Sequence, residues 1–381
     1  MDVPFHSSFA GRSVFLTGHT GFKGSWLAIW LQQLGAYVHG YSLAPPTQPS
    51  SFEVAEVREL LAGHYECDMR DIDSLAGAID KANPEIVFHL AAQPIVRTSY
   101  ETPRETIETN FMGTCNLLEC VRRRAKPCVV VVVTSDKCYE NREQVWGYRE
   151  NDAMGGHDPY SASKGAVEIL VASYRRSFFG PEDCGEHGVK LATARAGNVI
   201  GGGDWAKDRI VPDAARHLAE GKPVPVRCPW AVRPWQHVLE PLSGYLSLAA
   251  KMMADDDPQW CDGWNFAPET GDDATVCDVV ETFCRAWGQG TWEDMSDPTQ
   301  PHEANVLRLS IEKAIARLDW RPIWDFHETV VRTARWYRNY YSRNKASMRD
   351  ACLDDIRSYA TAAGGRESLC SSDVQRRGAA A

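Results

Sequence analysis

Short apolar runs alternate with stretches of helical apolar spacing over the first half of the chain. Runs that predict strands lie at residues 14–16, 37–43, 64–67, 85–91, 128–133 and 190–200. Between the first two, Trp26, Leu27, Trp30, Leu31 and Leu34 recur at the spacing of one helix face. Residues 129–133 are consecutive valines, which are typical of a central strand covered on both faces. The alternation predicts an α/β domain with a doubly wound parallel sheet over residues 1–200.

The pattern changes after residue 200. Most of the 13 tryptophans, many prolines and shorter helical patches fall there, which predicts a smaller, loop-rich substrate lobe over residues 201–343. This boundary leaves open a return of part of the later chain to the first domain. The final stretch, 344–381, combines charged residues with Ala, Gly and Ser, and is predicted to be a weakly structured tail.

The overall charge narrows the classes of partner. With a net charge of −10 and a pI near 5.6, the chain lacks the basic surface that binding to nucleic acid or anionic membranes requires. No stretch approaches the ~20 apolar residues of a membrane span, and the N-terminus lacks the pattern of a signal peptide, so a cytoplasmic protein is expected. The twelve cysteines include no C-x-x-C pair, and no Cys/His cluster or H-E-x-x-H string occurs. We therefore expect reduced thiols and no metal site.

Three glycines, Gly18, Gly21 and Gly24, follow the first predicted strand and precede the first helix. The unpaired N–H groups and positive dipole end of a helix N-terminus bind a pyrophosphate, and glycine lets the phosphate approach the backbone. The stretch, including Phe22 and Lys23, therefore predicts a Rossmann-like nucleotide cradle, with an ordinary tight turn as the alternative. Lys23 precedes Gly24 and is out of register for a triphosphate-binding G-x-x-x-x-G-K-S/T loop, so a dinucleotide is favoured over ATP.

Further cofactor contacts are expected at the ends of the next strands. Ser42 stands where dinucleotide folds usually place an acid for the adenosine ribose, which leaves both NAD and NADP open. Asp68, followed by Met69, is a candidate for the adenine amino group, although its residue type alone favours a helix cap. The remaining candidates are Leu90, Ala91 and Ala92 at a strand end, and Asn110 within the helical stretch 103–124.

Tyr160 and Lys164 are candidates for acid/base chemistry. At i and i+4 they share one helix face, where the ammonium stabilises the phenolate and lowers the pKa of the tyrosine. Ser135, Asp136 and Lys137 end the valine-rich strand, and the carboxyl ends of parallel strands form the functional edge of such a sheet. The Y-x-x-x-K spacing recurs at 341 and 345 without strand-end partners, so that copy is interpreted as a solvated helix face.

Together these features resemble the extended short-chain dehydrogenase/reductase family of sugar nucleotide enzymes. The strings G-H-T-G-F-K-G-S-W-L, T-S-D-K-C-Y-E-N, W-G-Y-R-E-N-D, G-N-V-I-G-G-G-D-W-A-K-D-R and R-P-W-Q-H-V-L-E are similar to those of its 4,6-dehydratases, and the resemblance extends from Gly11 to Tyr341. It implies a tightly held NAD, a nucleotide-sugar substrate, CDP-glucose, and a hydro-lyase reaction. C4 oxidation, elimination across C5 and C6, and return of the hydride to C6 yield a 4-dehydro-6-deoxy sugar in that reaction.

The resemblance also implies roles for the catalytic candidates. Tyr160, assisted by Ser135 and Lys164, removes the proton of the sugar 4-hydroxyl in this scheme, and Asp136 protonates the departing C6 hydroxyl. Lys137 stands where dTDP-glucose dehydratases have the glutamate that takes the C5 proton. We therefore expect Lys137 to be the C5 base, a role that lysine can fill only in its neutral form; a purely electrostatic role on the enolate is the alternative.

Substrate binding is expected mainly in the second lobe. The resemblance places Asn198, Arg209 and Arg233 near the nucleotide and its diphosphate, and arginine forks suit phosphate oxygens. Three further candidates have an equally simple explanation in surface ion pairs or helix surfaces: Gln93, Arg97 and Arg227.

Two other functions share parts of this pattern. A C4 epimerase, or a dehydratase of another nucleotide sugar, also uses a tyrosine and lysine pair, but an epimerase has no need for Asp136 and Lys137 as an acid/base couple. A non-catalytic NAD-binding scaffold needs the glycines but can dispense with Tyr160. Because all the catalytic candidates are present in this sequence, the scaffold ranks last. The resemblance further implies a homodimer or higher homo-oligomer, paired through the helices expected at 103–124 and 161–178.

Overall fold

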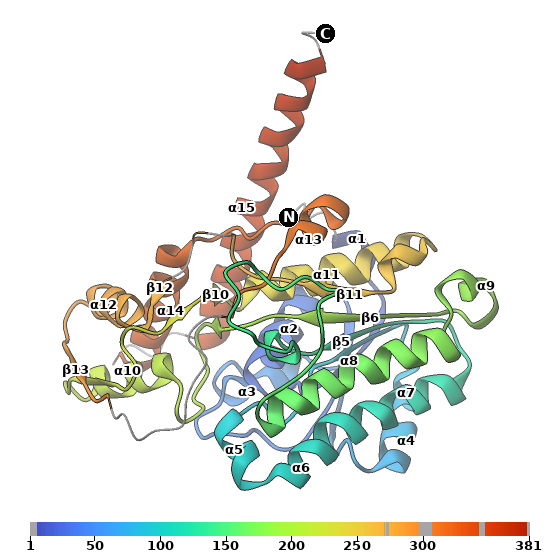
Figure 1. The fold of residues 1–381 in the computed structure, drawn as a ribbon, viewed down its shortest axis with the longest axis horizontal. Coiled ribbons are helices and arrows are strands. Elements are labelled where there is room, and N and C mark those ends of the chain that lie inside the picture. Colours follow the sequence, from blue (N-terminus) through green and yellow to red (C-terminus); the bar gives the residue numbers. More distant parts are fainter. Residues whose placement is uncertain (1–5, 270, 272–273, 297–306, 343–346, 379–381) are drawn as a thin grey trace.

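The fold is known from a computed structural model that describes residues 6–378 except 270, 272–273, 297–306 and 343–346 (Figure 1). The side chains of His6 and of residues 365–378 are not described. Two layers of helices enclose a central sheet, and a smaller group of helices and short strands lies to one side of it (Figure 1).

The central sheet has seven parallel strands in the order β11-β6-β5-β4-β1-β2-β3, which confirms the predicted doubly wound fold. The strands are β1 (Ser13–Thr17), β2 (Tyr37–Ser42), β3 (Gly63–Glu66), β4 (Ile86–His89), β5 (Cys128–Val133), β6 (Val189–Arg195) and β11 (Gly263–Asn265). From β1 the chain runs outward through β2 to β3 and then returns to the other side of β1 as β4. The strand order therefore reverses between β1 and β4, and ligands of such folds bind at this point.

Each strand points alternate side chains to the two helical layers. Phe15, Val87 and Val130 pack on the side that holds α4 (Ile72–Ala82), α7 (Gly113–Arg124) and α8 (Pro159–Ser177). Val14 and Leu16 face the opposite side, which holds α2 (Phe22–Gln33), α11 (Leu239–Ala254) and the C-terminal α15 (Met348–Gly378). Since both faces are covered, the strands can be almost wholly apolar.

The helical stretch predicted at 103–124 is a single rod with a local irregularity. It consists of α6 (Pro103–Ile107), a π-helical turn (Glu108–Met112) and α7. Asn110, a predicted cofactor contact, lies within the π turn and is 1% exposed. Widened turns of this kind are frequent at functional sites.

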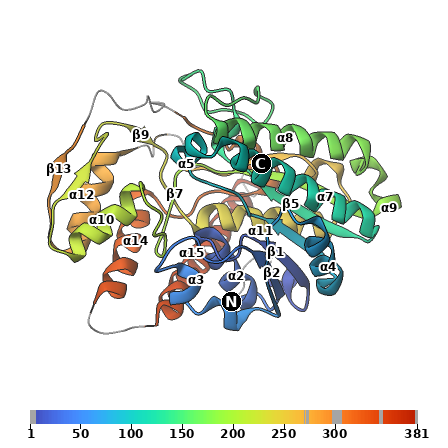
Figure 2. The same ribbon diagram turned by 90° about the horizontal axis from the view of Figure 1, so that it is seen from below.

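The second lobe is assembled from segments after residue 200 (Figure 2). It contains α10 (Ile210–Ala219), α12 (Val276–Trp287) and α14 (Phe326–Tyr341), with the short strand pairs β8/β13 (Val224–Val226, Trp292–Asp294) and β9/β12 (Val232–Arg233, Ala274–Thr275). Two segments of the same region return to the first domain, because α11 covers the sheet and β11 forms its edge. A third pair, β7/β10 (Val199–Ile200, Gln236–His237), connects the two regions.

The C-terminal segment differs from the predicted weakly structured tail. Residues Met348–Gly378 form α15, and Met348, Cys352, Ile356 and Tyr359 are at most 5% exposed. The Tyr359 hydroxyl donates to Glu240 Oε2 at 2.6 Å, and its ring lies 5.7 Å from that of Trp30 in α2. The prediction was therefore wrong for the first turns of this helix, and the parts of the predicted tail at 344–346 and 379–381 lie outside the described residues.

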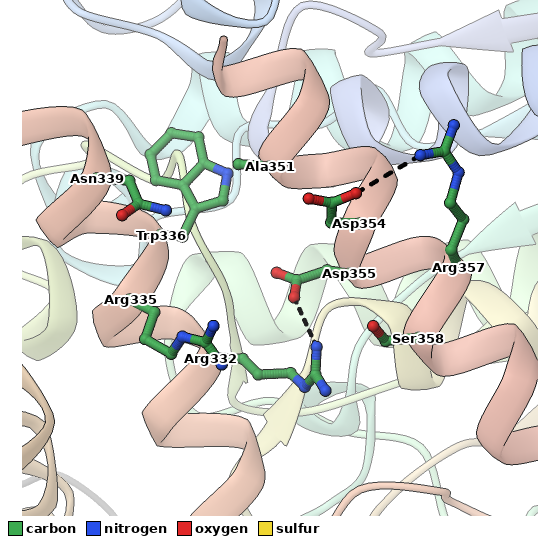
Figure 3. Close-up of a pocket in the computed structure, with 9 residues that line it drawn as sticks. All are labelled: Arg332, Arg335, Trp336, Asn339, Ala351, Asp354, Asp355, Arg357 and Ser358. Atoms are coloured by element: carbon green, nitrogen blue, oxygen red, sulfur yellow. Dashed lines mark hydrogen bonds and ion pairs between the residues drawn. The ribbon is translucent and has the colours of Figure 1, made fainter. Parts of the chain in front are cut away.

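A pocket of about 410 Å³ lies between α14 and α15 (Figure 3). Two ion pairs line it, from Arg332 to Asp355 at 2.9 Å and from Arg357 to Asp354 at 3.5 Å. Burial raises the pKa of Asp355 to about 6, against the opposing effect of Arg332. None of the predicted site residues lines this pocket, so it is separate from the chemistry described below.

Three sequence expectations concern features of the described part of the chain. Across those residues no helix is long and apolar enough to cross a membrane. The same residues contain no group of three or more His, Cys, Asp or Glu side chains that could hold a metal ion. The cysteines whose side chains are described are free thiols, most of them buried.

Candidate active site

The predicted catalytic residues come from two neighbouring elements. Ser135 and the short 3₁₀ turn Asp136–Cys138 follow directly after β5. Asp158 caps the start of α8 by accepting from the Ser161 N–H at 2.9 Å, so Tyr160 lies in the first turn of that helix and Lys164 one turn later. Both side chains are buried, with 7% and 6% of each residue exposed.

Hydrogen bonds join these residues into one cluster. The Tyr160 hydroxyl is hydrogen-bonded to Ser135, whose Oγ donates to Asp136 Oδ1 at 2.8 Å. The Lys137 ammonium lies 3.4 Å from the same carboxylate oxygen. The second oxygen, Asp136 Oδ2, is buried and has no hydrogen-bond partner among the described residues. A Cβ at Gly197 would collide with that oxygen, so glycine there leaves room for the carboxylate.

The electrostatics of Tyr160 differ from the sequence expectation. Burial raises its pKa above the usual value, and the Ser135 hydrogen bond, Lys137 and Arg209 only partly oppose this effect. Lys164, which we expected to lower that pKa, donates instead to the Val133 carbonyl at 3.4 Å. Burial lowers the pKa of Lys164 itself to about 8. In this arrangement the cations that favour the phenolate are therefore Lys137 and Arg209.

The surroundings of Lys137 determine its protonation state, and this state decides between its two possible roles as the C5 base and as a cation that stabilises the enolate. Burial lowers its pKa, but the Asp136 carboxylate and Tyr160 outweigh burial, so the net pKa is raised. A base at C5 must be a neutral amine, whereas a raised pKa keeps the side chain an ammonium ion. This balance favours the electrostatic alternative.

The glycine stretch has the geometry of a phosphate cradle. Gly21 precedes α2 without any side-chain cap, so the first N–H groups of the helix face outward. Gly18 has φ +74°, and a Cβ there would lie 2.7 Å from the Ala91 nitrogen. A Cβ at Gly24 would overlap the Gly18 carbonyl oxygen, whereas one at Gly21 would come no closer than 3.3 Å to protein. Gly18 and Gly24 are therefore needed by the fold, and Gly21 leaves open the space that a dinucleotide pyrophosphate requires.

Two side chains of the cradle face the second lobe and the catalytic cluster. Phe22 packs against the backbone at Gly201. Lys23 has its pKa lowered to about 7, chiefly by burial and by Arg209, with Asp136 opposing them. Lys164 and Lys137 also lower it. Sequence reasoning assigned Lys23 to the cofactor alone and missed its place beside the catalytic groups, because only the fold brings α2 and β5 together.

The adenosine end of the expected cofactor site is polar but lacks a carboxylate at β2. Ser42 is 9% exposed and its Oγ lies 2.8 Å from Thr20 Oγ1. Asp68 forms a two-point ion pair with Arg70, at 2.6 and 2.9 Å. The cap of α4 is Asp71, which accepts from the Ser74 N–H at 3.0 Å, so the helix-cap interpretation of Asp68 was wrong.

The candidates after β4 are tied to the cradle and to α8. The backbone N–H groups of Leu90 and Ala91 both donate to Thr17 Oγ1 at 3.1 Å. Asn110 accepts from the Gln93 N–H at 2.7 Å and donates to Ser163 Oγ at 2.9 Å. These bonds hold the strand end against the π turn and the catalytic helix. The remaining cofactor candidates of this region are Met69, which is buried beside Gly113, and Ala92, which follows Ala91.

The predicted substrate-binding residues divide into two groups. Arg209 forms a 2.6 Å ion pair with Asp204 and acts electrostatically on Tyr160, and Arg233 acts likewise on Lys137, so both arginines lie near the catalytic cluster. Asn198 has φ +21° and a buried Nδ2 without a hydrogen-bond partner among the described residues, which leaves a donor for a ligand.

The other two arginines converge on one carboxylate. Arg227 and Arg97 bind Asp208 Oδ1 at 2.7 and 3.4 Å. All three side chains are more than a third exposed, so the ion-pair interpretation given for Arg227 fits the structure.

Comparisons with known proteins show which family the chain resembles. The family model for GDP-mannose 4,6 dehydratase matches residues 15–333. A CDP-glucose 4,6-dehydratase from Salmonella typhimurium is 50% identical over 328 residues, which cover 86% of this chain and 91% of that protein. A dTDP-glucose 4,6-dehydratase from Streptomyces antibioticus is 29% identical over 271 residues, covering 70% and 73% of the two chains.

Solved structures share the fold. A UDP-glucose 4-epimerase from Thermotoga maritima, solved with UDP-glucose, has a TM-score of 0.74 at 22% identity and covers 86% of this chain and 99% of its own. A dTDP-glucose 4,6-dehydratase from Streptomyces venezuelae, solved with NAD, has a TM-score of 0.71 at 22% identity, covering 85% and 96%. Because the family model covers most of the sequence and a 50% identical relative covers nearly all of its own length, the chain belongs to the GDP-mannose 4,6 dehydratase family, among the extended short-chain dehydrogenase/reductases.

Proposed function

We propose that this protein is an NAD-dependent lyase that converts CDP-D-glucose to CDP-4-dehydro-6-deoxy-D-glucose and water. The observation that carries the proposal is the cluster of Tyr160, Ser135, Asp136 and Lys137, which places an acid/base tyrosine, a carboxyl group and a cation within one hydrogen-bonded set. The choice of CDP-glucose rests on the name of the relative that is 50% identical.

The residues of the cluster suit the steps of a 4,6-dehydration. NAD, whose pyrophosphate the cradle at Gly18–Gly24 would hold, would supply the acceptor for a hydride from sugar C4 and the source of a hydride for C6. Tyr160 takes the 4-hydroxyl proton with Ser135 as its hydrogen-bond partner. The ketone formed at C4 acidifies the C5 hydrogen; the Asp136 carboxylate, through its unpartnered Oδ2, takes the C5 proton and returns it to the departing C6 hydroxyl, which leaves as water. Lys137, as an ammonium ion, stabilises the enolate oxygen.

The substrate's diphosphate is proposed to bind at the boundary of the two lobes. Arg209 and Arg233 are close enough to act electrostatically on Tyr160 and Lys137, and guanidinium groups bind phosphate oxygens in a two-point geometry. The free Nδ2 of Asn198 supplies a further donor. These groups neutralise a nucleotide diphosphate in a protein whose overall charge is −10.

A C4 epimerase is the second candidate, because the same fold occurs in UDP-glucose 4-epimerases. Epimerisation needs only removal and return of the C4 hydride. The contact of Asp136 with both Ser135 and Lys137 has no task in that reaction, which favours the dehydratase.

Isotope transfer separates these functions. CDP-glucose deuterated at C4 is incubated with the protein and NAD, and the products are analysed by mass spectrometry. A dehydratase moves the label to C6 of a product lighter by water, whereas an epimerase returns it to C4 of a product of unchanged mass. Return of the label to C4 would overturn the proposal, and so would an unreacted substrate.

The identity of the cofactor is also open to test at the β2 end. Selection of NADP commonly uses an arginine beside the ribose 2′-phosphate. The loop after Ser42, residues 43–50, contains no lysine or arginine, and Arg70 is held by Asp68. These observations support NAD.

The free thiols of the described cysteines are compatible with the proposed cytoplasmic location.

Two glycine substitutions should separate folding from cofactor binding. Gly18→Ala is expected to destabilise the protein by about 1–3 kcal/mol, since its φ of +74° disfavours a side chain. Gly21→Ala should cost less stability than Gly18→Ala, because Gly21 has φ −78° and its Cβ would crowd a single protein atom, the Gly18 carbonyl oxygen at 3.3 Å, but it should weaken NAD binding by roughly tenfold or more. Calorimetry of unfolding and of NAD binding measures both effects. Unchanged NAD affinity in Gly21→Ala would contradict the placement of the pyrophosphate.

Self-association is proposed to occur through α8 and the α6–α7 rod. Large apolar side chains are exposed along these elements, namely Ile107 (46%), Met112 (45%), Ile169 (60%) and Phe178 (48%). Ile169→Glu is expected to convert a dimer to a monomer in analytical ultracentrifugation, because the interface cannot bury an unpaired charge. Val145→Glu, on an exposed loop, is the control and should leave the dimer intact. Identical sedimentation of Ile169→Glu and the unmodified protein would exclude this interface.

A further inference from the structure

A buried ion pair stands directly behind the catalytic cluster. Glu168 and Arg195 have side chains that are only 2% and 4% exposed. Arg195 Nε and Nη2 donate to the two carboxylate oxygens at 2.9 and 2.8 Å. Thr193 donates to the second oxygen at 2.7 Å, and Thr134 to the first. Both charges are therefore fully hydrogen-bonded in a dry environment.

This pair touches every element that carries a catalytic residue. Glu168 lies one turn after Lys164 on α8, and its partner Thr134 immediately precedes Ser135. On the far side of the catalytic turn, Arg195 Nη1 donates to the Tyr139 hydroxyl at 2.5 Å. The pair is thus hydrogen-bonded to Thr134 and Tyr139, on either side of the Ser135–Lys137 segment, and links both residues to α8, the helix that carries Tyr160.

Stability alone does not explain an ion pair in this position. A buried pair loses its hydration, and apolar replacements of similar volume are often as stable or more so. The charge does, however, reach the active site. Glu168 is the main group that raises the pKa of Lys164 against burial, with Cys138 adding to it. From other elements, Lys23 on α2 and His89 on β4 are within electrostatic reach of Lys164, and burial lowers the pKa of His89 to about 3, so that ring is neutral.

We propose that Glu168 and Arg195 are positioning residues for the dehydration, which hold Lys164 and Tyr160 against the Ser135–Lys137 turn and provide the negative charge that the Lys164 ammonium faces. The inference rests on the proposed function for its kinetic consequence, but its electrostatic part concerns this chain alone.

The test compares Glu168→Gln with the double variant Glu168→Gln/Arg195→Met. In the single variant kcat for CDP-glucose should fall about 10- to 100-fold with little change in KM. Loss of the carboxylate lowers the pKa of Lys164, the residue that the family resemblance assigns to assist Tyr160 as an ammonium ion, so the alkaline limb of the kcat profile should move to lower pH by about one unit. The double variant removes both charges, so its melting temperature should recover towards that of the unmodified protein while kcat and the pH limb do not.

Titration of Lys164, followed by NMR with isotope-labelled lysine and without substrate, gives a readout independent of turnover. A lowered Lys164 pKa in both variants supports the inference even if another nucleotide sugar proves to be the substrate. Glu240→Gln is the control, because Glu240 is equally buried but binds Ile323, Trp324 and Tyr359. Glu240→Gln should lower the melting temperature without moving the alkaline limb of the kcat profile. Recovery of kcat and of the pH limb in the double variant would overturn the inference, since the pair would then serve the fold alone.

Discussion

Tyr160→Phe is expected to lower kcat for dehydration of CDP-glucose by roughly 100- to 10,000-fold, the range typical of a lost general acid or base. The ring is retained, so packing on the buried face of α8 is unchanged. Ser135 keeps its bonds to Asp136 Oδ1 at 2.8 Å and to the Lys137 N–H at 3.2 Å, so the strand-end turn should persist. Product formation is measured by mass spectrometry and folding by thermal unfolding.

Tyr341→Phe is the matched control, because Tyr341 begins the second Y-x-x-x-K string and is 36% exposed on α14. Its hydroxyl lies 3.4 Å from Trp205 Nε1, on the side of the second lobe. This variant should retain the full kcat. Equal activity of Tyr160→Phe and the unmodified protein would show that the base at the 4-hydroxyl is a different group.

The parts of the site that sequence could predict are those whose signal is local. The spacing of Tyr160 and Lys164 fixes a shared helix face, and the position of Ser135–Lys137 after a valine run fixes a strand end. The fold then brings the two together, because β5 and α8 are adjacent layers. Neither step required knowledge of distant contacts.

The parts that sequence missed depend on contacts between distant segments. Lys23 looks like a cradle residue until α2 places it beside Asp136 and Arg209. Glu168 and Arg195 are ordinary charged residues in sequence, and only the adjacency of α8 and β6 makes them a buried pair. The cap of α4 is Asp71 rather than Asp68, a shift of three residues that propensity cannot resolve.

The C-terminal helix was missed for a different reason. The apolar residues of the first turns follow a helical spacing, namely Met348, Cys352, Ile356 and Tyr359. The residues between them are polar, however, and the last part of the segment lowers the average hydrophobicity of the whole stretch. Burial of the apolar residues needs the face formed by α2, α11 and α14. Helix formation there follows from tertiary packing, which supplies most helical stability in proteins.

Substitution of Lys137 should separate charge from basicity in the elimination step. If the ammonium stabilises the enolate, Lys137→Arg keeps a permanent cation and should retain C5 exchange with solvent deuterium within about tenfold of the unmodified rate. Lys137→Ala should lower that exchange by roughly 100- to 1,000-fold, as does loss of a donor that stabilises an oxyanion. C4 oxidation, seen as absorbance of the reduced cofactor, should remain detectable in both variants.

The raised pKa of Lys137 makes the charge role the expected outcome, because a side chain held as ammonium by Asp136 and Tyr160 is a poor base near neutral pH. Arginine cannot lose its proton in a protein and so cannot replace a base. An arginine variant as inactive in C5 exchange as the alanine variant would therefore restore Lys137 as the C5 base. Unchanged C5 exchange in Lys137→Ala would exclude Lys137 both as the C5 base and as the cation that stabilises the enolate. The groups responsible would then have to be others around the unpartnered Oδ2 of Asp136.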